Sequence, residues 1–367
     1  MVRAPLFYRL TRYTNKLSRA EKADPVKIFD RLPNLQDHQI INYQVDSSGK
    51  WMCLVGIAQV QGRVAGNMQL YSVERKVSQP LEGHAAAFVD YQIPGAPKPS
   101  TLFCFATRTP AQSKFFVLEV GKTETDSGPK FPRRTTDIFF PPEAAVDFPV
   151  SLQVSRKHHI AFLITKMGYL HMFDIVTGTL IYMNKIVQDK DTIFVTCPHT
   201  ETSGLVGVNR RGQVLLLSVN EQTIIPYLTS KGEIDVARQL ASRAGLPGAE
   251  ELFLRQFQLF FQQGRFQDAA RVAAESPNGF LRTIQTIRMF QAAQGTPAPI
   301  LQYFSVLLEH GKLNKLETLE LVRPVIAQGK VELLEQWISK DQLEYCEELG
   351  DALRQAGNMK LAVHVYL

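Results

Sequence analysis

Short apolar runs separated by turn residues fill the first half of the chain, and one of these runs recurs. The copies of this run are residues 66–73, 115–120, 168–175 and 212–219. Each copy follows another apolar run, at residues 51–57, 102–106, 160–165 and 204–208. Runs of this length, bounded by turn residues, predict β-strands. Gly66, Gly168 and Gly212 open three of the copies, where we expect glycine to supply the positive φ of a tight turn.

The copies recur at intervals of about 45–55 residues, with at least two strands in each interval. Such a period is typical of the blades of a β-propeller. A β-sandwich also alternates strands and turns, but it gives no reason for one motif to recur at this interval. The sequence therefore predicts propeller blades.

Helical periodicity replaces the strand pattern after residue 219. Ile234, Val236, Ala237, Leu240 and Ala241 are spaced so that they share one face of a helix. Four later junctions combine a glycine, a polar residue and an apolar residue, beginning at Gly264, Gly311, Gly329 and Gly357. We expect each of these glycines to end a helix in the left-handed backbone conformation. Stacked helical hairpins, an α-solenoid similar in style to tetratricopeptide arrays, account for this pattern.

The net charge of +6 is concentrated at one end of the chain. The first 20 residues contain five arginines and lysines and no acidic residue, so the remaining residues are close to neutral. Nucleic-acid-binding proteins spread basic residues along one face of the fold, and nucleic acid is therefore not an expected partner. Residues 1–24 are expected to be a flexible or atypical start of the chain. A transit peptide is the alternative, because the segment is basic and poor in acids.

No motif for catalysis, a metal ion or a cofactor occurs in the sequence. The four cysteines are far apart and form no CxxC pair, which is typical of reduced thiols rather than of disulfides or a zinc site. Phosphate-binding loops, GxGxxG, G-x-S-x-G and HExxH are absent. We therefore predict that the protein is not an enzyme and has no catalytic residues, metal site or cofactor.

A resemblance to a known family lies in residues 39–43, 66–84, 137–143, 162–166, 209–214, 281–283, 301–304 and 347–351. In these segments the chain closely resembles the clathrin heavy chain family. The resemblance is nearly collinear from about residue 25 to the last residue. Members of this family have a seven-bladed propeller, a linker and a long helical leg that ends in a trimerisation hub. The resemblance thus implies a multidomain β and α fold, a partial β-propeller of about four of the seven blades followed by an α-helical solenoid.

The resemblance also implies how the chain is divided into domains. Residues 1–24 are an unmatched basic segment, 25–222 the partial propeller, 223–245 a helical linker and 246–367 the start of the solenoid leg. We expect a truncated or divergent paralogue, or an incomplete gene model. An open propeller is expected to expose apolar blade-packing surface at its flanks.

Peptide-docking positions are implied as well. The family binds apolar peptides of arrestin type between its fourth and fifth blades, and the matching positions are Trp51, Leu70, Arg75, Val77, Gln79 and Leu81. A tryptophan-motif pocket of the family matches Gln39 and Ile41. Indole and leucine side chains suit apolar peptide groups, and Arg75 and Gln79 can bond to peptide carbonyls. From the residues alone, Trp51 and Leu70 are better explained as blade core, and Arg75 as a solvated turn residue, whereas the resemblance favours the peptide site.

The implied function is that of a structural component of clathrin-type coats in endocytosis and vesicle-mediated protein transport. Expected partners are adaptor and arrestin-type peptides and other clathrin heavy chains, whereas light-chain binding is not expected. The expected location is cytoplasmic, on coated pits and coated vesicles, with membrane contact only through adaptors. The alternative is a non-clathrin propeller–solenoid scaffold, or a truncated paralogue that has lost coat assembly.

Overall fold

The structure is a computed structural model that describes residues 28–122, 128–187 and 192–366. The predicted basic segment 1–24 lies outside these residues. The chain divides into two compact units, one ending at Val219 and the other beginning at Asn220. Each unit is described by itself below.

The first unit consists of antiparallel sheets in which consecutive strands are neighbours, as in propeller blades. The first sheet contains β1 (Gln39–Val45), β2 (Trp51–Val60), β3 (Arg63–Ser72) and β4 (Val77–Glu82). The second contains β5 (Ala85–Tyr91), β6 (Ser100–Arg108), β7 (Ser113–Glu119) and β8 (Arg134–Asp137). The third contains β9 (Pro149–Val154), β10 (Ile160–Thr165), β11 (Tyr169–Asp174) and β12 (Leu180–Lys185). Within the described residues, the fourth contains β13 (Ile193–His199), β14 (Gly204–Asn209) and β15 (Val214–Leu217).

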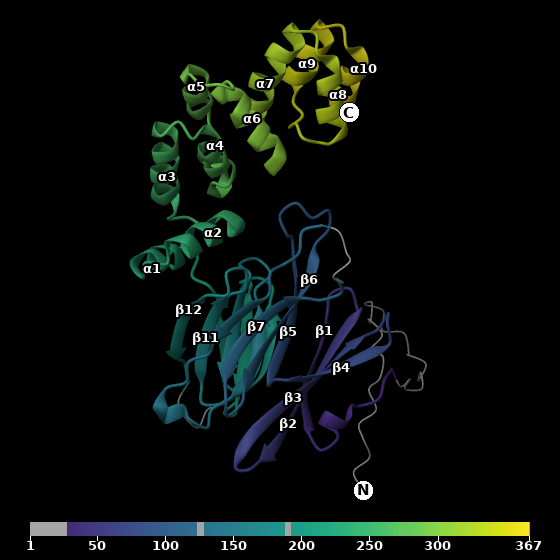
Figure 1. The fold of residues 1–367 in the computed structure, drawn as a ribbon, viewed down its shortest axis with the longest axis vertical. Coiled ribbons are helices and arrows are strands. Elements are labelled where there is room, and N and C mark those ends of the chain that lie inside the picture. The colour runs from purple at the N-terminus through teal and green to yellow at the C-terminus, as the bar shows by residue number, and fades with distance from the viewer. Residues whose placement is uncertain (1–27, 123–127, 188–191, 367) are drawn as a thin grey trace. The chain divides into compact units, whose positions relative to one another are not determined.

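The sheets follow one another in chain order across the first unit (Figure 1). Their first strands are neighbours, since β1 packs against β5, β5 against β9 and β9 against β13. One apolar cluster joins the first sheet to the second, and a larger one joins the second to the third. Two short 3₁₀ turns, η1 (Pro33–Leu35) and η2 (Pro142–Ala144), lie in the connections. The predicted partial propeller is therefore confirmed.

Glycine has two different roles in the recurring strand. Gly168 and Gly212 have positive φ values of 85° and 77°, as predicted for turns. The prediction is wrong for Gly66, which lies inside β3 and has no positive φ. A Cβ atom at Gly66 would lie 2.5 Å from the carbonyl oxygen of Gly83. Glycine is required there because two backbone segments approach each other closely.

The first and fourth sheets leave apolar side chains exposed. On β1, Ile41, Tyr43 and Val45 are 39–47% exposed. In the fourth sheet, Val195 and Val214 are 52% and 69% exposed. These side chains agree with the expected apolar surface at the flanks of the propeller.

The second unit is built from helices that pack in antiparallel pairs. They are α1 (Ile224–Ser230), α2 (Ile234–Ala244), α3 (Glu250–Gln262), α4 (Phe266–Ala274), α5 (Ile284–Ala292), α6 (Pro299–His310), α7 (Lys315–Ala327), α8 (Val331–Ser339), α9 (Glu347–Gln355) and α10 (Met359–Tyr366). A short 3₁₀ turn, η3 (Pro277–Gly279), connects α4 and α5. Four of the five residues predicted to share one face of α2 are buried, while Ile234, at the first position of the helix, is 50% exposed.

Three of the four predicted helix-ending glycines have the expected left-handed conformation. Gly264, Gly329 and Gly357 have φ values of 71°, 69° and 82°. Gly311 differs, with φ 152° and ψ −150°. The chain leaves α6 in an extended conformation there, because Leu313 then forms a parallel β-bridge with Leu343.

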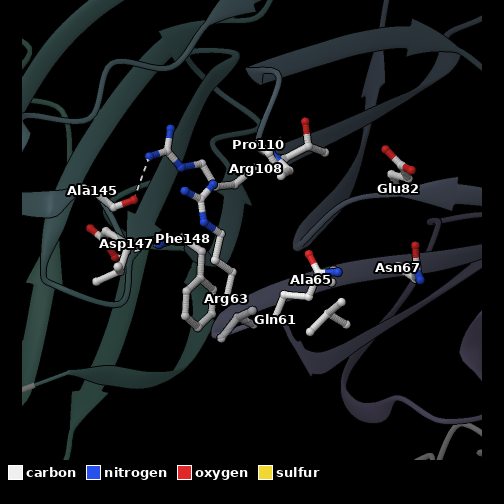
Figure 2. Close-up of a pocket in the computed structure, with 15 residues that line it drawn as sticks. Gln61, Arg63, Ala65, Asn67, Glu82, Arg108, Pro110, Ala145, Asp147 and Phe148 are labelled. Atoms are coloured by element: carbon white, nitrogen blue, oxygen red, sulfur yellow. Dashed lines mark hydrogen bonds between the residues drawn. The ribbon is translucent and has the colours of Figure 1, made fainter.

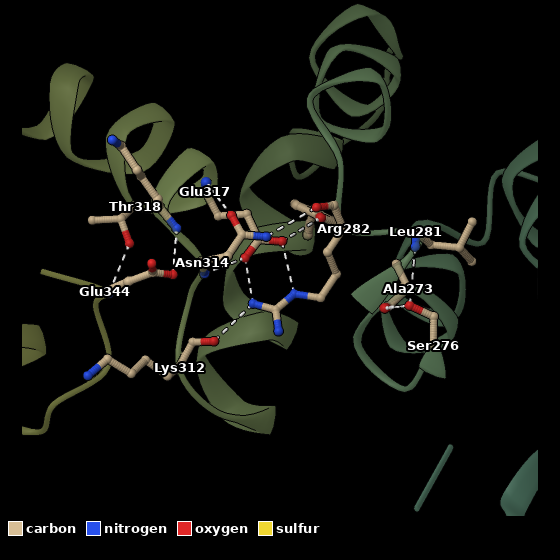
Figure 3. A network of polar contacts seen from close by, with 11 residues as sticks. Ala273, Ser276, Leu281, Arg282, Lys312, Asn314, Glu317, Thr318 and Glu344 are labelled. Carbon is tan, nitrogen blue, oxygen red and sulfur yellow. Dashed lines mark hydrogen bonds and ion pairs between the residues drawn. The ribbon is translucent and has the colours of Figure 1, made fainter. Parts of the chain in front are cut away.

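A buried polar network joins α5, α6 and α7 (Figure 3). Glu317 on α7 is fully buried, and its carboxylate accepts hydrogen bonds from Arg282 at 2.5 and 3.0 Å. The same carboxylate accepts from the Tyr303 hydroxyl at 3.1 Å and from the Asn314 backbone N–H at 2.9 Å. Burial, and then the negative charge of Glu317, raises the pKa of Tyr303, so its hydroxyl stays a donor. Four donors thus compensate the desolvation of one carboxylate.

Removing this carboxylate should destabilise the helical unit strongly. In Glu317→Ala, the half-buried Arg282 loses its counterion and the α7 capping box loses one of its two bonds, so we expect a loss of about 3–5 kcal/mol in the free energy of unfolding. Urea unfolding followed by circular dichroism at 222 nm measures this loss. Glu335→Ala, which removes an exposed carboxylate from α8, is the control and should leave the transition unchanged. Equal transitions in the two variants would contradict the assigned role of the network.

Candidate functional site

Five of the six positions matched to the arrestin-type site belong to strands of the first sheet, and the strand register places them on one face. Trp51 lies opposite Ser72, which lies opposite Val77. In the same way, Cys53, Leu70 and Gln79 form one row, and Val55, Met68 and Leu81 form another. Directly paired residues point to the same side of a sheet, as do alternate residues along a strand. The sixth position, Arg75, lies in the turn between β3 and β4.

This face of the first sheet packs against the second sheet. Cys53, Val55, Met68 and Leu70 form one cluster with Phe103, Phe105 and Phe116 of β6 and β7. Trp51 and Leu81 lie at the margin of the cluster together with Leu118 and Val120. We call this region the blade junction.

The side chains at the blade junction differ in their access to solvent. Leu70 is 4% exposed and belongs to the core, whereas Val77 is 59% exposed. Arg75 and Gln79 are also exposed, and Trp51 and Leu81 are half-buried. The surface available to a ligand therefore consists of Trp51, Leu81 and the three exposed side chains, with Leu70 beneath it.

The second sheet contributes groups that sequence reasoning missed. The Arg75 guanidinium donates a hydrogen bond to the carbonyl oxygen of Gly121 at 3.3 Å. A Cβ atom at Gly121 would lie 3.6 Å from Nε1 of Trp51, so this glycine approaches the indole closely. The strand 115–120 was predicted from the sequence. Its apolar residues Val117, Leu118 and Val120 were the only sequence signal that this strand contributes to the blade junction.

Gln39 and Ile41 occupy a different part of the sheet. Both are exposed residues of β1, which is the edge opposite β4. The register shifts between Ile40 and Asn42, so Ile41 lies in a bulge. The structure therefore does not bring these two residues together with Val77, Gln79 and Leu81.

The described residues offer little for redox or metal chemistry. Within 28–122, 128–187 and 192–366, no group of three or more His, Cys, Asp or Glu side chains could hold a metal ion. Cys53 and Cys104 are buried, and burial raises the pKa of both thiols. In the same described part, no helix is long and apolar enough to cross a membrane.

Sheets in the order of propeller blades, followed in the chain by packed helices, define a propeller–solenoid protein. A family model described as Clathrin-H-link matches residues 245–307. Clathrin heavy chains of Dictyostelium discoideum and Drosophila melanogaster are 50% and 51% identical over 349 residues, and clathrin heavy chain 2 of Homo sapiens is 50% identical. These alignments cover 94% of this chain. The chain is a homologue of the clathrin heavy chains.

The alignments also show what fraction of each relative's length this chain covers. The chain spans about a fifth of the length of these relatives, 20% of the Dictyostelium and Drosophila proteins and 21% of the human one. The Clathrin-H-link match falls entirely within the helical unit, from the residue after α2 into α6.

Leu70 and Val77 should respond differently to truncation, because one is core and the other is surface. Leu70→Ala leaves a cavity in the blade junction, and we expect a loss of about 2–5 kcal/mol in stability. Val77→Ala removes exposed methyl groups and should leave stability nearly unchanged. Thermal unfolding of the two variants measures the difference. A Leu70→Ala variant as stable as Val77→Ala would show that Leu70 is not a core residue.

Proposed function

We propose that this chain functions as a structural part of clathrin-type vesicle coats, in endocytosis and vesicle-mediated transport. The observation that carries the proposal is sequence identity of about one half to clathrin heavy chains along 94% of the chain, through both units. No observation favours the alternative, a propeller–solenoid scaffold unrelated to clathrin. The proposed role is non-catalytic, and the proposed location is the cytoplasmic side of coated pits and vesicles.

The proposed partners at the blade junction are short apolar peptides of adaptors and arrestin-type proteins. Trp51 and Leu81 offer half-buried apolar surface, and Val77 extends it along β4. β4 is an edge strand, so peptide backbone can lie beside it. Arg75 and Gln79 are exposed next to this surface and can donate hydrogen bonds to peptide carbonyls.

Binding at such a small surface is individually weak. Only a few half-buried side chains are available at the blade junction, and each peptide contact there buries little area. Adaptor proteins with several peptides, facing several copies of this chain, would gain strength from multivalency. We therefore propose further that other heavy chains are partners, and that membrane association occurs only through adaptors. Gln39 and Ile41 are proposed as a separate contact for tryptophan-containing peptides.

Charge reversal at Arg75 should weaken peptide binding selectively. We expect Arg75→Glu to reduce the affinity for a short apolar arrestin-type peptide by roughly tenfold, since a charged hydrogen bond is worth about 1.5–3 kcal/mol. Gln79→Ala should reduce it less. Isothermal titration of the peptide against each variant measures these changes. Arg156→Glu, which reverses an exposed arginine outside the blade junction, is the control. Unchanged affinity in Arg75→Glu and Gln79→Ala would remove the assignment of this site.

Co-assembly separates a coat component from an unrelated scaffold. The purified chain, mixed with a full-length clathrin heavy chain under cage-forming conditions, is expected to sediment with the cages. A chain that stays in the supernatant at every ratio would favour the scaffold alternative.

A further inference from the structure

A cavity of about 570 Å³ lies in the first unit, where turns of the first and second sheets meet the segment after η2 (Figure 2). The start of β3 supplies Arg63, the end of β6 supplies Arg108, and the segment after η2 supplies Asp147. Its volume lies within the range of peptide and small-ligand sites. None of the eight predicted peptide-binding residues lines it.

Two guanidinium groups lie together in the middle of this cavity (Figure 2). Arg108 donates hydrogen bonds to the Ser113 hydroxyl and to the carbonyl oxygen of Ala145, and it lies over the Phe140 ring at 4.2 Å. The exposed Arg63 makes no hydrogen bond or ion pair with a described residue. Burial, and then the charge of Arg63, lowers the pKa of Arg108. The charge of Asp147 raises the pKa of Arg108, but neither guanidinium forms an ion pair with a described carboxylate. Two adjacent cations of this kind are stabilised when they share an anion.

The Arg108 backbone is held in place by a buried histidine. Nδ1 of His84 accepts a hydrogen bond from the Arg108 backbone N–H at 3.2 Å. Nε2 of the same ring therefore carries the proton and donates to the carbonyl oxygen of Val64 at 3.1 Å. His84 is 1% exposed, and burial lowers its pKa. The neutral ring ties the end of β6 to β3, so the two arginines are presented by a fixed framework.

The other residues that line the cavity determine which anions can bind in it. Glu82 and Asp147 also line the cavity, and Figure 2 shows them on opposite sides of the two arginines. Their charges balance those of the arginines, so a polyanion would meet repulsion at both ends. A single carboxylate carries less negative charge than a polyanion, so Asp147 and Glu82 repel it less. The lining also includes two exposed apolar side chains, Val60 and Val146, which are 48% and 73% exposed.

We propose that this cavity binds a peptide segment in which one carboxylate side chain is flanked by small apolar side chains. The carboxylate lies between Arg63 and Arg108, and the apolar side chains contact Val60 and Val146. This site is separate from the blade junction, so its test does not depend on the function proposed above.

The test compares two peptides that differ in one charge. The probes are fluorescein-labelled Gly-Val-Glu-Val-Gly, blocked at both ends, and the same peptide with Gln in place of Glu. We expect the Glu peptide to bind the full chain and the Gln peptide to bind at least tenfold more weakly. Arg63→Gln should weaken the Glu peptide similarly, because it removes a guanidinium that no described residue holds. Arg156→Gln, the matched loss of an exposed positive charge, and Arg75→Glu should leave binding unchanged.

Three outcomes would overturn the proposal. One is equal binding of the Glu and Gln peptides or no binding of either. Another is a Glu affinity that Arg63→Gln leaves unchanged while the melting temperature stays that of the parent chain. The third is stronger, Arg63-dependent binding of vesicles containing a phosphoinositide, which would assign the cavity to a lipid headgroup instead. Loss of Glu-peptide binding in Arg63→Gln alone, with an unchanged melting temperature, supports the peptide site.

Discussion

The packing of the first sheet on the second is the contact on which both proposed binding surfaces of the propeller unit depend. The space between the two sheets is filled by Leu70 and Cys53 of the first sheet and by Phe103 and Phe116 of the second. Because this core is dry and close-packed, the strands above it cannot shift independently. Trp51 and Arg75 are thereby held against Gly121 of the second sheet. The same packing brings Arg63 of the first sheet near Arg108 of the second.

The sequence was informative where a pattern repeats locally. Strand pairs recurring at blade intervals predicted β2, β6, β10 and β14 and the strands that follow them, and helical spacing predicted the buried face of α2. The sequence was misleading where a glycine is required by a contact with a residue distant in the chain. Gly66 was interpreted as a turn residue, although its role is to let the Gly83 carbonyl approach. Gly311 likewise differs because Leu313 pairs with Leu343, a contact that no local spacing indicates.

The residues of the candidate site also divide into those that could be predicted from the sequence and those that could not. The resemblance placed the first-sheet residues, and the strand register explains why five of them share a face. For Leu70 the residues alone favoured a core position and the resemblance favoured a peptide contact, and its burial assigns it to the core. The contribution of Gly121, and the meeting of Arg63 with Arg108, depend on tertiary packing between sheets. Arginines 45 positions apart in the sequence carry no common motif, so their proximity appears only in the folded chain.

The polar contacts of the helical unit link groups about one hairpin apart in the chain. Arg282 reaches Glu317, Asn314 reaches the carbonyl of Arg282, and Gln342 reaches the carbonyl of Leu308. Directional bonds of this kind set the angle between successive hairpins more strictly than apolar contact alone. A solenoid extends each such angle over all the hairpins that follow it. The Glu317 carboxylate therefore helps to fix the orientation of the hairpins that follow it. A small change of angle there would displace later hairpins by a distance that increases along the solenoid.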